Sequence, residues 1–217
     1  MFKIDLHTHS HASVDGSITL EDYRKKLTSG SLDMIAITDH DSIEFARDVQ
    51  MKLGARIIVG EEITTNDGEI IGLYLTKTVK RGMSCTDTVK AIQDQGGLVY
   101  IPHPFETVRE GISPRALAAI ADDVDIVEIS NGRAFWQNRG RQARAWATQH
   151  LRAMAASSDA HGTRGWGKTY SETGELPERD SLIRLLNMDG THFQKGKVGL
   201  RGVLYPKFNR LRKRGLK

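Results

Sequence analysis

The chain has 217 residues, of which 39% are hydrophobic and 27% are charged, and its net charge is +4. These values are typical of one ordinary globular domain, with or without an appendage. They exclude a bilayer-spanning segment, since no apolar run approaches the roughly 20 residues required, and the first residues lack the pattern of a signal peptide. Cys85 is the only cysteine, so no intrachain disulfide can form and we expect a reducing, cytoplasmic compartment.

Short apolar segments alternate with segments of helical character, and no internal repeat is present. Thr19 and Ser42 are expected to open the first two helices, Thr65-Asn-Asp-Gly68 is a hairpin signal, and Pro114 stands where a helix tolerates proline. In chain order, the expected elements are strand 2–6, helix 19–27, strand 34–38, helix 42–53, strand 56–60, strand 69–75, helix 87–95, strand 98–101, a helix from 114, strand 125–129, helix 138–152, strand 154–158 and helix 180–187.

Repeated strand–helix units with apolar, buried strands predict a parallel α/β sheet or barrel. Most of the candidate ligands described next directly follow a predicted strand. Barrel enzymes place their chemistry at the carboxyl ends of their strands. The sequence therefore predicts a parallel α/β sheet or barrel with a site at the carboxyl ends of its strands.

Five segments end a short apolar run with a metal-binding side chain. Residues two apart on a strand point to one face, which pairs His7 with His9, whereas only one of Glu61 and Glu62 can point inward. So many histidines and carboxylates exceed the needs of one ion and suit a cluster of two or three. The segments are His7-Thr-His9, Thr38-Asp39-His40, Gly60-Glu61-Glu62, Pro102-His103-Pro104 and Ser158-Asp159-Ala160-His161.

Asp15 and Glu69 are two further candidate ligands. Asp15 lies in the loop after the first strand, where it could equally be a turn aspartate. Glu69 is folded back toward Glu62 by the predicted hairpin, although it could also be an exposed charge. Asp5 shares a strand face with His7 and could be its partner or an acid at the end of the core.

Basic residues near these segments are candidates for binding a phosphate. A guanidinium group matches phosphate oxygens well, and we expect two of four basic residues to bind an anion. The sequence has no glycine-rich loop of the nucleotide-triphosphatase type. The four basic residues are Arg109, Arg133, Arg164 and Lys168.

Taken in order and spacing, five motifs resemble those of the PHP (polymerase and histidinol phosphatase) family of metal-dependent phosphoesterases. The resemblance covers about residues 1–165 and implies a distorted (β/α)7 TIM-like barrel with a metal cluster at the C-terminal strand ends. We therefore expect a phosphoesterase domain at 1–189 and a basic tail or helix at 190–217. The motifs are Asp5-Leu-His-Thr-His9, Ile37-Thr-Asp-His-Asp41, Gly60-Glu-Glu-Ile-Thr64, Pro102-His-Pro-Phe105 and Ser158-Asp-Ala-His161.

The resemblance also implies ligands for two or three ions of zinc, manganese or iron. Many family members have histidine where this chain has Glu69, and the carboxylate is expected to favour harder ions such as manganese. Residues 162–167 also lack an acid that similar short proteins have there. The implied sets are His7, His9, Glu62 and Asp159 for one ion, Glu62, Glu69 and His103 for the second, and Asp15, His40 and His161 for the third.

The implied reaction is hydrolysis of a phosphate monoester, a nucleotide or a small phosphorylated metabolite, by water that the ions activate. Arg109, Arg133 and Lys168 would bind the phosphate, and His40 or His161, if free of metal, would protonate the leaving alcohol. Two alternatives remain: a nuclease acting on nucleic-acid ends, and a metal-binding accessory domain without turnover.

The C-terminal segment bears on the first of these alternatives. Residues 190–217 hold nine Lys or Arg and no Asp or Glu, so the rest of the chain is net acidic. Such a segment could touch nucleic acid, a phosphorylated ligand or an acidic membrane surface, or it could be a solvated helix or a frayed end.

Overall fold

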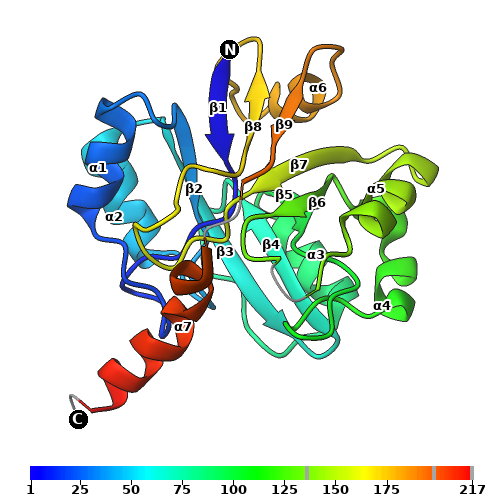
Figure 1. Cartoon of the computed structure of the whole chain (residues 1–217). Coiled ribbons are helices and arrows are strands. Elements are labelled where there is room, and N and C mark those ends of the chain that lie inside the picture. Colours follow the sequence, from blue (N-terminus) through cyan, green and yellow to red (C-terminus); the bar gives the residue numbers. More distant parts are fainter. Residues whose placement is uncertain (135–136, 197–198, 216–217) are drawn as a thin grey trace.

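A curved sheet of nine strands forms the centre of the protein (Figure 1). The computed structural model describes residues 1–134, 137–196 and 199–215. Six of the strands are parallel, and β4 is antiparallel to both of its neighbours. In chain order, the first seven strands are β1 (Phe2–Asp5), β2 (Met34–Ile37), β3 (Ile57–Thr65), β4 (Gly68–Leu73), β5 (Leu98–Ile101), β6 (Ile126–Asn131) and β7 (Ala153–Ser157).

The sheet curves into a nearly closed barrel because the segments that follow its first and seventh strands meet. Thr8 forms a parallel bridge with Ala160, His9 N donates to Ala160 O at 2.8 Å, and Asp159 N donates to His7 O at 2.9 Å. The predicted α/β barrel is therefore confirmed. The junction also brings two predicted ligand motifs side by side.

Two antiparallel strands that the sequence did not predict extend the sheet beyond β1. They are β8 (Tyr170–Thr173), which pairs with β1, and β9 (His192–Gln194), which pairs with β8. Both are short, at four and three residues, and the polar Tyr-Ser-Glu-Thr of β8 lacks the apolar run by which the other strands were identified.

Helices follow most of the strands. Thr19 caps α1 as predicted, in a capping box with Asp22. The expectation that Ser42 opens α2 is wrong: this helix begins at Glu44 without a side-chain cap. The helices are α1 (Leu20–Thr28), α2 (Glu44–Leu53), α3 (Cys85–Gln93), α4 (Pro114–Ala119), α5 (Gly140–Gln149), α6 (Leu182–Leu186) and α7 (Gly199–Arg214), with a short 3-10 turn at Ala121–Asp123.

The apolar core has two parts, one on each face of the sheet. Alternate strand residues such as Ile35 and Ile37 pack with buried side chains of α1 to α5. The intervening residues, such as Met34 and Ala36, pack with other strand residues and with α6, so they fill the barrel interior. No helix within the described residues is long and apolar enough to cross a membrane.

Candidate metal centre

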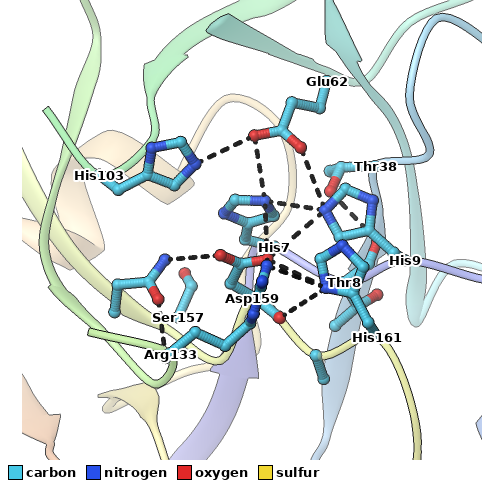
Figure 2. Close-up of polar contacts among 12 residues, drawn as sticks. His7, Thr8, His9, Thr38, Glu62, His103, Arg133, Ser157, Asp159 and His161 are labelled. Carbon is cyan, nitrogen blue, oxygen red and sulfur yellow. Dashed lines mark hydrogen bonds and ion pairs between the residues drawn. The ribbon is translucent and has the colours of Figure 1, made fainter. Parts of the chain in front are cut away.

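Nine metal-binding side chains converge at the end of the barrel where the parallel strands have their carboxyl ends. Figure 2 shows His7, His9, Glu62, His103, Asp159 and His161 among them. The nine come from β3, β4 and the segments that follow β1, β2, β5 and β7. All nine belong to groups whose ligand atoms lie within 4.8 Å of one another. They are His7, His9, Asp15, His40, Glu62, Glu69, His103, Asp159 and His161, the set that the sequence suggested.

The backbone carries strain at two of these ligands. His103 has a φ of 27° and Asp159 a φ of 52°, values that non-glycine residues seldom adopt. Such conformations persist where surrounding contacts impose them, and they concentrate at functional sites. Each residue lies two positions beyond the end of a strand, β5 for His103 and β7 for Asp159, where the chain turns and its side chain joins the cluster.

A first group consists of His7, His9 and Asp159. The Nε2 atoms of the two histidines are 3.0 Å apart, and each lies 3.7 Å from Asp159 Oδ1. The Nδ1 of His7 bonds to Glu128 Oε1 at 3.2 Å, which favours the tautomer whose Nε2 lone pair faces the group. A cation shared by these three side chains would satisfy both nitrogens and the carboxylate.

Glu62 lies at the middle of the cluster. Its Oε1 is 3.4 Å from His7 Nε2 and 3.2 Å from His103 Nε2. Its Oε2 is 3.1 Å from His9 Nε2 and 3.3 Å from His40 Nδ1. Each carboxylate oxygen thus faces a different pair of imidazoles, which suits a carboxylate that bridges two ions.

Glu69 lies beside Glu62 because β3 and β4 form the predicted hairpin. The register pairs Thr64 with Glu69, and the carboxylate oxygens of Glu69 lie 3.7 Å from His40 Nδ1 and 3.8 Å from His103 Nε2. Glu61 points the opposite way and accepts a hydrogen bond from Val79 N at 2.8 Å.

A third group consists of His9, Asp15, His40 and His161. Asp15 Oδ1 is 3.4 Å from His161 Nε2 and 3.6 Å from His40 Nε2. This oxygen is buried without a hydrogen bond among the described residues. A buried carboxylate oxygen needs a cation or several donors, and a divalent ion held by Asp15, His40 and His161 would meet that need.

The charges within the cluster are strongly perturbed. Burial opposes protonation of His7, but the carboxylates of Glu62, Asp159 and Glu128 outweigh it and raise its pKa well above the usual value. Burial, together with the electrostatic effects of the neighbouring His9 and Arg133, lowers the pKa of His161 to about 3. Burial and the negative charge of Glu62 raise the pKa of Glu69.

These nitrogen and oxygen donors fit two or three divalent ions. Buried carboxylates that face one another are costly unless cations compensate them. Imidazole suits zinc and iron, whereas carboxylate suits manganese, so the mixed donor set admits any of the three metals.

Comparison with known proteins identifies the family. The sequence profile of the PHP domain matches residues 5–164. The chain belongs to the PHP family. It is 32% identical over 142 residues to the uncharacterized protein MJ1587 of Methanocaldococcus jannaschii, a match that covers 59% of this chain and 81% of that protein.

Solved structures share the PHP fold. One is a two-domain protein from Bacteroides vulgatus containing a predicted PHP-like metal-dependent phosphoesterase, with a TM-score of 0.63 and 20% identity over 96% of this chain and 63% of that one. Another is the lesion-specific endonuclease PfuEndoQ from Pyrococcus furiosus, with a TM-score of 0.62 and 16% identity over 88% of this chain and 57% of that one. This chain therefore spans less than two thirds of either protein.

Two buried acids outside the predicted ligand set, Glu128 and Asp39, support the candidate ligands. Glu128 of β6 bonds to His7 and accepts from the backbone N of His103 at 2.7 Å. Asp39 accepts from Ser13 Oγ at 2.8 Å, and this hydroxyl lies 3.3 Å from His9 Nδ1. A charged residue at an inward-facing position of an apolar strand was the signal available for Glu128.

Two of the three candidate arginines, Arg109 and Arg133, reach the cluster. Arg109 Nη1 donates to Asp159 Oδ2 and to Asn131 Oδ1, and Arg133 Nη1 lies 3.1 Å from Asp159 Oδ1. The positive charges of both arginines and of His7 hold the pKa of Asp159 well below its usual value, against the effect of burial.

The other two basic candidates are surface residues. Arg164 and Lys168 are exposed. Within the described residues, no ion pair or side-chain hydrogen bond links either of them to the metal ligands.

Proposed function

We propose that this PHP protein hydrolyses phosphate monoesters, with a nucleotide or a small phosphorylated metabolite as its substrate. The observation that carries the proposal is the pair of guanidinium groups, Arg109 and Arg133, at one edge of a nine-ligand cluster. The terminal phosphate of a monoester carries up to two negative charges and a diester only one, so two adjacent guanidinium groups match the monoester better.

The lone cysteine is a free, buried thiol, in keeping with the expected cytoplasmic location.

The proposed roles follow from position. When bound, the divalent ions would lower the pKa of a water molecule and neutralise charge that develops on the phosphate. Arg109 and Arg133, whose side chains are 15% and 14% exposed, would orient the phosphate oxygens. His40 is 18% exposed against 2% for His161, so in a centre whose third ion is absent, where its ring is free of metal, it is the better placed of the two to protonate the leaving alcohol.

The test compares a generic aryl phosphomonoester with a generic diester. The protein is stripped of metal and reloaded with manganese, zinc or iron, beside His103→Ala and the matched control His192→Ala, which alters an exposed histidine of β9. Monoester turnover that is lost in His103→Ala and retained in His192→Ala supports a phosphatase. Cleavage of the diester alone contradicts the monoester proposal, and no turnover with any metal favours a non-catalytic role.

A nuclease is the second candidate, favoured by the charge on α7. Lys207, Arg212 and Arg214 are exposed on this helix, and the PHP fold also occurs in the lesion-specific endonuclease PfuEndoQ. Replacing these three residues with alanine should then weaken binding of a single-stranded oligonucleotide and lower its salt dependence. Unchanged binding at low salt would count against this candidate.

A further inference from the structure

The C-terminal basic segment is built into the surroundings of the metal centre. Helix α7 lies beside the loop that follows β1 (Figure 1), and its side chains bond to that loop. The PHP profile ends at residue 164, so none of the matched motifs describes these contacts.

The contact nearest the cluster joins Arg210 to Asp15. Arg210 Nη2 donates to Asp15 Oδ2 at 2.8 Å, and the arginine side chain is 52% exposed whereas that of Asp15 is 3% exposed. Asp15 Oδ1, the other oxygen, faces His40 and His161. Arg210 thus hydrogen-bonds to Oδ2 of Asp15 and leaves Oδ1 directed at His40 and His161.

The preceding residue of α7 ties together both chain segments that supply this group. Asn209 is buried, and its Nδ2 donates to Asp15 O at 2.7 Å and to His161 O at 3.2 Å. These two ligands are far apart in sequence, and the amide group fixes the distance between their backbones. The ring of Tyr205 covers Gly162, where a Cβ atom would lie 2.7 Å from Tyr205 Cζ.

One turn further along, Lys213 holds the loop itself. Its Nζ donates to the carbonyl oxygens of His11 at 2.7 Å and Gly16 at 3.0 Å, and also to that of Ser13. The loop that carries Asp15 is therefore bonded to α7 through its backbone and its carboxylate.

We propose that α7 is a positioning element of the metal centre, in which Arg210 and Asn209 hold Asp15 and His161 in the arrangement that a third divalent ion requires. The inference rests on the proposed metal-dependent function. Residues that hydrogen-bond to a metal ligand and orient it typically change metal affinity by 10–100-fold. Because Arg210 contacts Asp15 of the third ligand group, the predicted effect is confined to one ion of the cluster.

The test is a titration of the full-length, metal-stripped chain with Mn²⁺ by calorimetry, with bound ions counted by mass spectrometry. Wild type is expected to bind three ions. Arg210→Ala should weaken one of them by about 10–100-fold and leave the other two unchanged, and Arg210→Lys should recover part of the loss. Leu211→Ala, which alters an exposed residue of the same helix, is the matched control and should bind as wild type does.

Each other outcome has a definite meaning. Three unchanged affinities in Arg210→Ala, or equal weakening of all three, would overturn the inference and leave the metal centre intact. Two ions in wild type would overturn it too, because the third group would then hold none. No ions in wild type would remove the proposed function, and the inference with it.

Discussion

Glu62 contacts more of the candidate ligands than a single carboxylate usually can, which makes its position critical to the cluster. Its two oxygens face four imidazoles from three different segments of the chain, so its own position must be fixed closely. The same need applies to the imidazoles, and buried acids behind them meet it. Glu128 bonds to His7 and, through the backbone, to His103, two residues that share Glu62 Oε1.

Glu128→Gln tests this support. The amide keeps the shape of the side chain but loses the charge that holds Nδ1 of His7 protonated, so we expect affinity for the tightest-bound Mn²⁺ to fall by about 10–100-fold. Calorimetric titration measures it, with Glu178→Gln, at an exposed position, as the control. Equal affinities in the two variants would mean that Glu128 is not a positioning residue.

The carboxylate at position 69 predicts a metal preference. Glu69 faces His40 and His103, and replacing it with the histidine of many PHP proteins substitutes a softer donor for a harder one. Glu69→His should therefore raise the ratio of zinc to manganese affinity. Competition between the two metals measures the ratio, with Glu110→His, at a neighbouring exposed residue, as the control. A ratio that stays constant or falls would contradict the argument.

At the scale of elements, the β3–β4 hairpin decides whether Glu69 reaches the cluster at all. Gly68 has a φ of +122°, and a Cβ atom there would lie 2.5 Å from Ile112 Cα. Both the backbone conformation and the close approach require glycine. The hairpin signal in the sequence was thus sufficient to place Glu69 beside Glu62.

Gly68→Ala should destabilise the protein by more than about 1 kcal/mol, because alanine fits neither the backbone angle nor the space. Urea denaturation measures the change in the free energy of unfolding. Gly174→Ala is the matched control, since no atom lies within 4 Å of a Cβ built there. Similar stabilities of the two variants would show that the hairpin tolerates a side chain.

The elements also show what the sequence could and could not predict. Apolar strands that end in ligands could be identified because each segment carries two independent signals: an apolar run, which indicates a buried strand, and a histidine or carboxylate at its end, which indicates a metal ligand. β8 and β9 lack an apolar run and could not be identified. The start of α2 was misplaced because Ser42 does not cap it; the neighbouring Asp41 instead accepts a hydrogen bond from Thr64 N at 2.9 Å. Nor did the basic composition of the C-terminal segment indicate that α7 would contact Asp15.

At the scale of the whole molecule, the cluster concentrates buried charge where the barrel closes. A ligand that binds only the folded chain raises the free energy of unfolding, and the increase grows with the ratio of ligand concentration to Kd. It is about 2.7 kcal/mol when the ligand concentration is 100 times Kd. Added Mn²⁺ should therefore raise the melting temperature, and chelation should reverse the rise. His103→Ala should show a smaller shift than His192→Ala, and equal shifts would place the stabilising ion elsewhere.

Without metal, stability should fall as the solution becomes alkaline. Burial opposes protonation of His40, but the carboxylates of Glu62, Asp15 and Glu69 outweigh it and raise its pKa to about 10. An unfolded histidine titrates near pH 6.5, so the charged form stabilises the fold fully below about pH 6.5, and this contribution is lost as pH rises toward 10. The raised pKa of His7 acts in the same direction.

Urea denaturation of the chelated protein between pH 6.5 and 10 measures this fall. His40→Gln should flatten it, because the amide does not titrate. The Mn²⁺-loaded protein should fall less, since a histidine that binds metal is already neutral and metal affinity itself rises as protons leave the ligands. A chelated protein whose stability stays constant or rises across this range would show that His40 is not held in its charged form by the surrounding carboxylates.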